Sequence, residues 1–252
     1  MSDGILVIPC YNESKRLELD RFATFMEEHE DVGFLFVDDG STDDTNRILS
    51  RWAAEWPGRA AVWCLPENVG KAEAVRRGVL RAIASDATWV GYWDADLSTP
   101  LSELAGMRAL LDRRPELEMV FGSRVQLLGR EIRRSPVRHY LGRTFATTVS
   151  LLLGIPVYDT QCGAKLFRTS PVVERLFVEP FVTKWVFDVE IIARLIASYG
   201  VEQGRARATG TIAEYPLRTW SDIPGSKLRP RDYVIAVRDL ARIFRRYFSD
   251  GR

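Results

Sequence analysis

Short apolar runs alternate with amphipathic segments along the first half of the chain. The apolar runs have the length of strands and lie at Gly4–Cys10, Val32–Val37, Ala60–Leu65, Trp89–Trp93 and Glu118–Gly122. Apolar residues recur at helical spacing in the segments between them, at Arg16–Glu30, Asp44–Glu55, Lys71–Ser85 and Leu101–Arg114. Connections of a dozen or more residues imply a mostly parallel sheet with helices on both faces, which is an α/β fold.

The second half of the chain has a less regular pattern. We predict helices at Tyr140–Leu153, Val182–Ala197 and Asp232–Phe248, and strands at the end of Asp159–Arg168 and at Ala208–Leu217. Val125–Arg138 is rich in arginine and has no clear period, so it is predicted to be a basic loop. Trp220–Pro230 is also predicted to be a loop, but not a basic one. No repeat, low-complexity segment or linker divides the chain, which predicts a single domain over residues 1–252.

Polar residues come directly after three of the predicted strands. They are Tyr11–Glu13, Asp38–Asp43 and Asp94–Ser98. The carboxyl ends of parallel strands meet at one edge of a sheet, where ligands bind in open α/β folds. The sequence therefore predicts a site at this edge.

Asp94 and Asp96 carry the clearest candidate chemistry. They directly follow the buried strand Trp89–Trp93, and Pro100 opens the next helix. Carboxylate oxygens with free coordination positions suit Mg²⁺ or Mn²⁺ on a diphosphate. The plain alternative is a capped turn with two solvated acids.

Composition narrows the class of protein. The 252 residues are 46% hydrophobic and 27% charged, as in ordinary globular proteins, and the net charge of +1 gives no argument for nucleic acid. Three dispersed cysteines and two histidines indicate a reducing compartment and no cysteine or histidine metal site. No apolar run reaches the ~18–20 residues of a membrane span, and the first residues lack the basic start of a signal peptide, so we expect a cytoplasmic protein.

Eight short motifs in order resemble inverting family-two glycosyltransferases of the GT-A fold. They are VIPCYNE (Val7–Glu13), VDDGSTDDT (Val37–Thr45), ENVGKAEAVRRG (Glu67–Gly78), DADLSTP (Asp94–Pro100), GSR (Gly122–Arg124), DTQCGAKLF (Asp159–Phe167), FDVE (Phe187–Glu190) and EYPLRTWSDIPGSKL (Glu214–Leu228). The last three look like the polyprenyl-phosphate sugar synthases, nearest to the dolichyl-phosphate β-glucosyltransferase type and next to the dolichol-phosphate mannose synthases.

The resemblance implies a donor site in the first half of the chain. Its residues would be Pro9, Tyr11 and Glu13 around the nucleobase, Asp38 and Asp39 on base or ribose, Lys71 near the nucleotide, and Asp94 and Asp96 on a Mg²⁺ or Mn²⁺ ion at the diphosphate. Ser98 falls where some mannose synthases have a glutamine that also binds the metal, and serine is a shorter, weaker ligand.

The resemblance also implies an acceptor phosphate held by arginines. Arg124, with Arg134 or Arg138, would bind it, because guanidinium pairs bidentately with phosphate. The alternative is that the arginines of this stretch form only a solvated basic loop. Gln161 and Lys165 are placed at the sugar or phosphate pocket, and Lys227 either closes over the diphosphate or is a surface lysine.

The need for a general base depends on the acceptor. A phosphate monoester has a second pKa of about 6 and arrives mainly as a dianion, whereas a hydroxyl needs a carboxylate base. Asp188 or Glu190 is the base candidate. They lie two apart and do not share a helix face, so one is expected in the cleft and the other in solvent. We assign the catalytic roles to Asp96, Arg124, Arg138 and Asp188.

The segment 231–252 is predicted to be a basic amphipathic helix, which rests on a membrane surface or packs on the domain.

We assign residues 1–100 to the nucleotide sugar and 101–230 to the acceptor. From these features we expect transfer of glucose or mannose, from UDP-glucose or GDP-mannose, to a polyprenyl phosphate at the inner face of a membrane. The alternative acceptor is a soluble hydroxyl or a small phosphorylated molecule. A nucleotidyltransferase is disfavoured because Ile5–Arg16 has no glycine-rich phosphate loop, and a non-catalytic sugar-nucleotide-binding module is disfavoured by the Asp94–Asp96 pair.

Overall fold

A seven-stranded sheet forms the centre of the molecule, in a computed structural model that describes residues 2–133, 136–222 and 230–249. The strand order is β3-β2-β1-β4-β7-β5-β8, and β7 alone runs antiparallel to its neighbours within this sheet. The bounds are β1 Gly4–Cys10, β2 Val32–Asp38, β3 Ala60–Cys64, β4 Trp89–Trp93, β5 Met119–Ser123, β7 Ala164–Arg168 and β8 Ile212–Pro216. The predicted mostly parallel sheet is confirmed.

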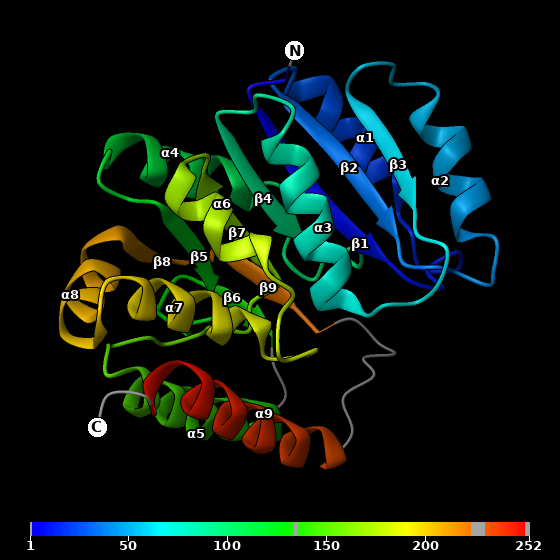
Figure 1. The fold of residues 1–252 in the computed structure, drawn as a ribbon. Helices are drawn as coiled ribbons and strands as arrows, with labels where there is room; N and C mark the ends of the chain where they lie inside the picture. The colour runs from blue at the N-terminus through cyan, green and yellow to red at the C-terminus, as the bar shows by residue number, and fades with distance from the viewer. Residues whose placement is uncertain (1, 134–135, 223–229, 250–252) are drawn as a thin grey trace.

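Helices cover both faces of the sheet (Figure 1). One face packs against α1 (Leu19–Glu28), α2 (Thr45–Ala53) and α4 (Glu103–Arg113), and the other against α3 (Lys71–Ile83), α6 (Pro171–Val178) and α7 (Phe187–Ser198). Successive residues of a strand point to opposite faces, so Leu6 and Ile8 enter the first core and Val7 the second. Each strand therefore needs apolar residues at every position, which is why the strands read as continuous apolar runs.

Two further helices lie beyond α7, away from the sheet (Figure 1). They are α5 (Pro136–Leu153) and α9 (Pro230–Phe248), and both contact α7. Ala236, Leu240 and Ile243 of α9 are buried, so the expectation that this helix packs on the domain is correct for one of its faces. None of the helices in the described segments is long and apolar enough to cross a membrane.

The polar loops predicted to meet at one sheet edge do meet there. The Asn12 amide donates to Ser41 Oγ (3.0 Å) and the Glu13 amide to Thr45 Oγ1 (2.8 Å), which joins the loops after β1 and β2. The strand order reverses between β1 and β4. Such a switch point leaves a crevice outside the carboxyl ends of the strands.

The strand predicted at Ala208–Leu217 is wrong in its first half. Residues Val201–Thr211 form helix α8, and β8 begins only at Ile212. The helix lacks an apolar period, and its close packing on α7 holds it: a Cβ at Gly204 would overlap the Ile196 carbonyl, and Ala208 is fully buried. A contact between two helices leaves no local signal in the sequence.

The loop predicted at Val125–Arg138 is also partly wrong. It contains β6 (Glu131–Arg133), which pairs with β9 (Thr219–Ser221), and α5 begins at Pro136. The three-residue strand β6 is fixed by a partner more than eighty residues away and by burial of Ile132. Proline suits the first turn of a helix because its missing N–H has no partner there.

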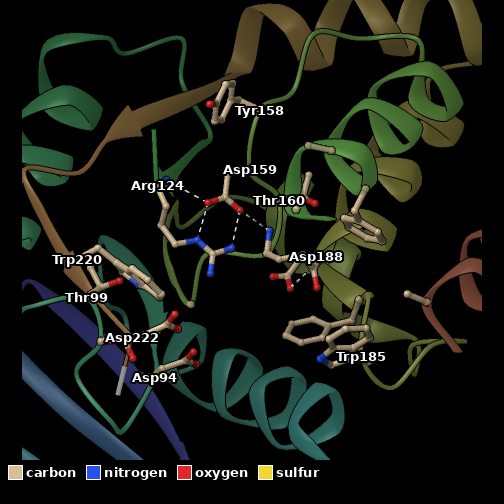
Figure 2. A pocket seen from close by; sticks show the side chains of 18 of the residues that line it. Asp94, Thr99, Arg124, Tyr158, Asp159, Thr160, Trp185, Asp188, Trp220 and Asp222 are labelled. Carbon is tan, nitrogen blue, oxygen red and sulfur yellow. Dashed lines mark hydrogen bonds and ion pairs between the residues drawn. The ribbon is translucent and has the colours of Figure 1, made fainter. Parts of the chain in front are cut away.

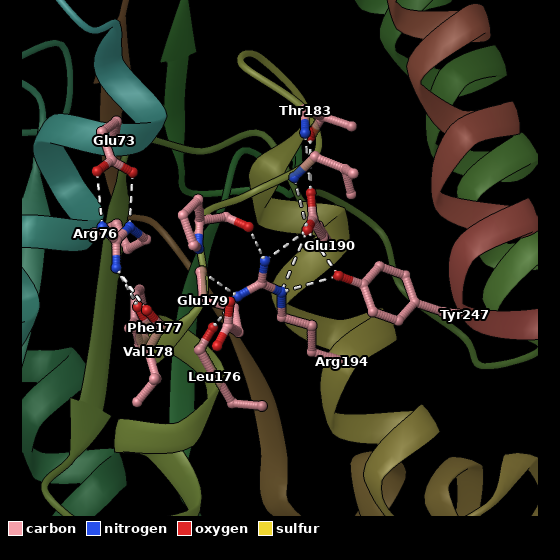
Figure 3. A network of polar contacts seen from close by, with 12 residues as sticks. Glu73, Arg76, Leu176, Phe177, Val178, Glu179, Thr183, Glu190, Arg194 and Tyr247 are labelled. Atoms are coloured by element: carbon pink, nitrogen blue, oxygen red, sulfur yellow. Dashed lines mark hydrogen bonds and ion pairs between the residues drawn. The ribbon is translucent and has the colours of Figure 1, made fainter.

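A buried ion pair joins α7, α9 and the loop that precedes α7 (Figure 3). Arg194 donates to Glu190 Oε1 (2.8 Å) and to the carbonyls of residues 176, 179 and 180. Glu190 also accepts from the amides of Val182 and Thr183 and from the Tyr247 hydroxyl (2.9 Å). Glu190 is fully buried, so the expectation that the second acid of the Asp188–Glu190 pair faces solvent is wrong: it anchors the C-terminal helix.

We expect Arg194→Met to lower the free energy of unfolding by about 3–5 kcal/mol, because it leaves Glu190 buried without its counter-ion. Tyr247→Phe removes one hydrogen-bonding hydroxyl from the charged pair and should cost about 1.5 kcal/mol. Urea unfolding measures both. Arg245→Met, an exposed arginine of the same helix α9, is the control and should stay within about 0.5 kcal/mol of the parent. Equal losses in Arg194→Met and Arg245→Met would contradict the anchoring role.

Candidate active site

A cavity of about 250 Å³ opens where the carboxyl end of β4 meets α5, the turn before β7, the start of α7 and β9. Figure 2 shows Asp94, Arg124, Asp159, Trp185, Asp188 and Trp220 facing one another around it. Several of the charged side chains in the cavity wall are already in ion pairs.

Asp94 and Asp96 reach the cavity because the chain alternates after β4. Ala95 and Leu97 are buried, while Asp94, Asp96 and Ser98 are partly exposed in the cavity wall. Leu97 has a φ of 51°, a left-handed conformation that side chains rarely adopt, so the turn is held in an unusual shape. Asp96 Oδ1 accepts from the Ser98 amide (3.0 Å) and hydroxyl (2.8 Å), so Ser98 orients this carboxylate.

Asp94 is fixed by a cation and by a close backbone contact. Lys71 Nζ, from the first residue of α3, lies 2.5 Å from Asp94 Oδ1. On the other side, the Asp94 amide donates to the Gly163 carbonyl (2.9 Å). A Cβ at position 163 would overlap the Asp94 carboxylate, so only glycine leaves space for it.

Asp38 and Asp39 are buried under the donor side of the sheet edge. Asp39 accepts from the amides of Val69 (2.8 Å) and Gly70 (2.9 Å), and Asp38 from the Ser41 amide (3.1 Å). Burial raises the pKa of the Asp39 carboxyl, against these amide hydrogen bonds. By accepting these hydrogen bonds, Asp38 and Asp39 hold the neighbouring loops in place. Their predicted role in binding a nucleobase or ribose stays a prediction.

The remaining predicted nucleobase residues lie at the same edge but do not line the cavity. Pro9, the next-to-last residue of β1, is partly buried, and Tyr11 is 37% exposed. Glu13 pairs with Arg16 (2.5 Å). The structure thus gathers Pro9, Tyr11 and Glu13 beside Asp38 and Asp39, next to the cavity.

Arg124 lines the cavity but is not a free cation. Its guanidinium makes a bidentate pair with Asp159 (2.6 and 2.7 Å) and stacks over the Trp220 ring at 5.3 Å. Burial works to lower the pKa of Arg124, and Asp159 raises it above its usual value. The positive charge of Arg124, which was predicted to bind an acceptor phosphate, is therefore largely neutralised by the Asp159 carboxylate.

Asp188 lies at the cavity wall, in the first turn of α7. Its carboxylate accepts from the Tyr92 hydroxyl, from Lys165 Nζ (2.8 Å) and from Gln161 Nε2 (3.4 Å). Lys165 is fully buried in β7. Burial raises the pKa of Asp188 and lowers that of Lys165, since both charged forms lose solvation. The structure thus brings Asp188 and Gln161 together in the cavity wall, and their roles there stay predictions.

Three predicted acceptor residues are not placed. Arg134 and Lys227 lie outside the described residues, and Arg138 belongs to α5 although its side chain is not described. Their roles stay predictions.

Both the sequence and the fold of this chain resemble those of known proteins. The sequence profile of the family described as "Glycosyl transferase family 2" matches residues 5–176. The chain is 31% identical over 256 residues to the dolichyl-phosphate beta-glucosyltransferase of Dictyostelium discoideum, covering 96% of this chain and 74% of the relative. It is 32% identical over 239 residues to the human protein of that name, covering 89% and 69%.

The chain belongs to glycosyltransferase family 2. Solved structures support the fold of this family-2 glycosyltransferase. Glucosyl-3-phosphoglycerate synthase of Mycobacterium tuberculosis, solved with Mn²⁺ and UDP-glucose, superposes with a TM-score of 0.67 at 19% identity, over 97% of this chain and 78% of that one. A mannosyltransferase of Pyrobaculum calidifontis, solved with GDP-mannose and Mn²⁺, gives 0.65 at 20% identity, over 99% and 65%. The predicted GT-A fold is confirmed.

The Asp94–Asp96 pair of this glycosyltransferase fits a divalent metal ion bound through a diphosphate. Both carboxylates reach the cavity, and hard oxygen donors suit Mn²⁺ or Mg²⁺. In the described segments no three His, Cys, Asp or Glu side chains form a group that could hold a metal. A metal ion held here would take this pair as its protein ligands and would need ligand oxygens, such as those of a diphosphate, to complete its coordination.

Sequence reasoning missed several residues of this glycosyltransferase cavity. Arg143, Tyr158, Trp185 and Trp220 line it. The partly buried Glu214 supports it from β8 by accepting from the amides of Tyr158 (2.8 Å) and Asp159 (2.6 Å). Arg143 lay within a predicted apolar helix and Glu214 within a predicted strand, so neither position carried a polar-cluster signal.

We expect Gly163→Ala to weaken Mn²⁺-dependent binding of UDP roughly 10- to 100-fold, the usual cost of disturbing a ligand's support. The reason is that the new methyl group displaces the Asp94 carboxylate. Titration calorimetry with and without Mn²⁺ measures the change. Gly210→Ala, in the open at the end of α8, is the matched control and should bind UDP as the parent does. Unchanged Mn²⁺-dependent binding in Gly163→Ala would refute the close contact.

Proposed function

We propose that this glycosyltransferase transfers glucose from UDP-glucose, with inversion, to the phosphate of a polyprenyl phosphate such as dolichyl phosphate. The observation that carries the proposal is that one cavity holds the Asp94–Asp96 pair on one side and an arginine-bearing wall on the other. Support for the sugar and the lipid comes from relatives named dolichyl-phosphate beta-glucosyltransferase, which match over most of the chain. The GDP-mannose donor has no such support.

The proposed reaction forms a bond between an acceptor phosphate oxygen and C1 of glucose, and breaks the bond between C1 and the UDP oxygen. A Mn²⁺ or Mg²⁺ ion on the diphosphate would supply charge stabilisation for the leaving UDP. Asp94 and Asp96 would hold that ion, and Lys71 would turn from Asp94 toward the diphosphate. Because the acceptor is a dianion, no side chain has to remove a proton from it.

The alternative is a soluble acceptor, either a hydroxyl compound or a small phosphorylated molecule. A hydroxyl acceptor needs a carboxylate as general base, and it is favoured by the presence of the Asp188 carboxylate in the cavity wall. It is already bound to Tyr92 and Lys165. A base would have to exchange these partners for the acceptor, so we favour the phosphate.

We further propose that the protein contacts a membrane surface through α5 and α9. Both helices line the cavity and expose apolar side chains, among them Tyr140, Leu151 and Val237 at 72%, 78% and 65% exposure. Arg238, Arg242 and Arg245 of α9 are exposed beside them. Apolar side chains with neighbouring arginines suit an anionic lipid surface, and a lipid phosphate could enter the cavity from there.

The proposed reaction predicts UDP release from UDP-glucose that requires both Mn²⁺ or Mg²⁺ and a short-chain polyprenyl phosphate, with GDP-mannose inactive. Asp96→Asn should reduce turnover at least about 100-fold, because the ion loses a ligand. Asp188→Asn should retain transfer to the phosphate acceptor. Loss of transfer in Asp188→Asn together with turnover on glycerol would favour the hydroxyl acceptor, and no UDP release with any acceptor would refute the assignment.

The membrane contact predicts that Val237→Glu lowers co-sedimentation with anionic vesicles about tenfold, since it removes the burial of one valine side chain. Val178→Glu alters a valine that is 51% exposed at the end of α6 and should bind vesicles as the parent does. Similar binding of both variants would argue against a membrane-facing α9.

A further inference from the structure

Among the residues that the structure describes, three cations line the cavity: Lys71, Arg124 and Arg143. Lys71 pairs with Asp94, and Arg124 pairs bidentately with Asp159. Arg143 has no carboxylate partner anywhere in the part of the chain that the structure describes. It therefore brings the cavity wall a positive charge that no carboxylate among the described residues neutralises.

The Arg143 side chain is nevertheless held in place. It projects from α5, is partly buried, and its guanidinium carbon lies 3.8 Å from the centre of the Tyr158 ring. Stacking on an aromatic face fixes the plane of a guanidinium and leaves the N–H groups at its edge free to donate. This arrangement presents the fork of donors that pairs with a phosphate.

The residues that hold the side chains of Arg143 and Arg124 in place are adjacent in the sequence. Tyr158 supports Arg143 through its ring, and Asp159 supports Arg124 through its carboxylate. The amides of both residues donate to the two carboxylate oxygens of Glu214 (2.8 and 2.6 Å). The partly buried Glu214 side chain on β8 thus fixes the peptide that carries both arginine supports.

We propose that Arg143 is a binding residue for the acceptor phosphate beside Arg124, and that Tyr158 is its positioning residue. This inference rests on the proposed function, since it assumes that the acceptor carries a phosphate. Arg124 alone adds little net charge because Asp159 neutralises it, whereas a dianion entering past Asp94, Asp96 and Asp188 needs an unmatched cation. Arg143 supplies that cation on the acceptor side of the cavity.

The test compares variants of Arg143 in glucose transfer to a short-chain polyprenyl phosphate and, separately, to glycerol 3-phosphate. Arg143→Ala should raise the KM for the phosphate acceptor roughly 10- to 100-fold, the range of a lost charge-assisted hydrogen bond. The affinity for UDP-glucose with Mn²⁺ should stay within about twofold of the parent. Arg143→Lys keeps the positive charge but loses the forked set of N–H donors. Its KM for the phosphate acceptor should therefore fall between that of the parent and that of Arg143→Ala.

Tyr158 provides a readout of positioning. Tyr158→Phe keeps the ring and should have the parent KM, while Tyr158→Leu removes the stacking face and should raise KM about fivefold with kcat little changed. Arg81→Ala is the matched control, because Arg81 stacks over Trp63 at 4.9 Å outside the cavity. It should leave both KM values unchanged.

Each outcome decides the inference. A rise in KM for both acceptors supports phosphate recognition, and a rise for the polyprenyl phosphate alone supports the same role with a lipid phosphate. If Arg143→Ala has the acceptor KM of Arg81→Ala, the inference is wrong while the proposed function stands. If Arg143→Ala weakens UDP-glucose binding as much as acceptor use, Arg143 belongs to the donor site and the inference is again wrong. If the parent transfers glucose to neither phosphate, the proposed function fails and this inference fails with it.

Discussion

The pairing of β4 with the antiparallel strand β7 joins the two sides of the active site. Tyr92 lies opposite Lys165 and Trp93 opposite Ala164, and the ladder continues to the hydrogen bond from the Asp94 amide to the Gly163 carbonyl. The turn before β7 carries Tyr158, Asp159 and Gln161. The same ladder that ends at Asp94 and Asp96, the carboxylates proposed to hold the metal ion, therefore sets where the turn on the other side of the cavity must lie. A shift by one residue would turn Lys165 away from Asp188 and remove the glycine beside Asp94.

Charge matching explains how so many ionisable groups share a small cavity. Lys71 with Asp94, Arg124 with Asp159, and Lys165 with Asp188 form three close pairs around it. An unpaired charge in such a place would be costly, since desolvation is offset only by a partner or a hydrogen bond. The pairs place the reactive groups at fixed positions before a ligand arrives. A diphosphate or a phosphate must then compete with an internal partner, except at Arg143.

The sequence could predict the donor side well because its signals are local. Each strand of the parallel half is a continuous apolar run followed by polar residues, so the position of Asp94 and Asp96 at the sheet edge follows from strand direction alone. The acceptor side was predicted less well. β6 depends on β9, α8 depends on a glycine contact with α7, and Glu190 is buried by Tyr247 from the end of the chain. Each of these is a contact between residues distant in sequence.

The sequence by itself determined the α/β fold, the family and the identity of the carboxylates at the switch point, because periodicity and short motifs are properties of neighbouring residues. Only the tertiary structure decided which charges are free. Arg124 and Arg143 are equally basic in the sequence, yet one faces a carboxylate and the other an aromatic ring. The difference arises from a turn that Glu214 holds from another strand, and a charge has no fixed meaning until its counter-ions are placed in space.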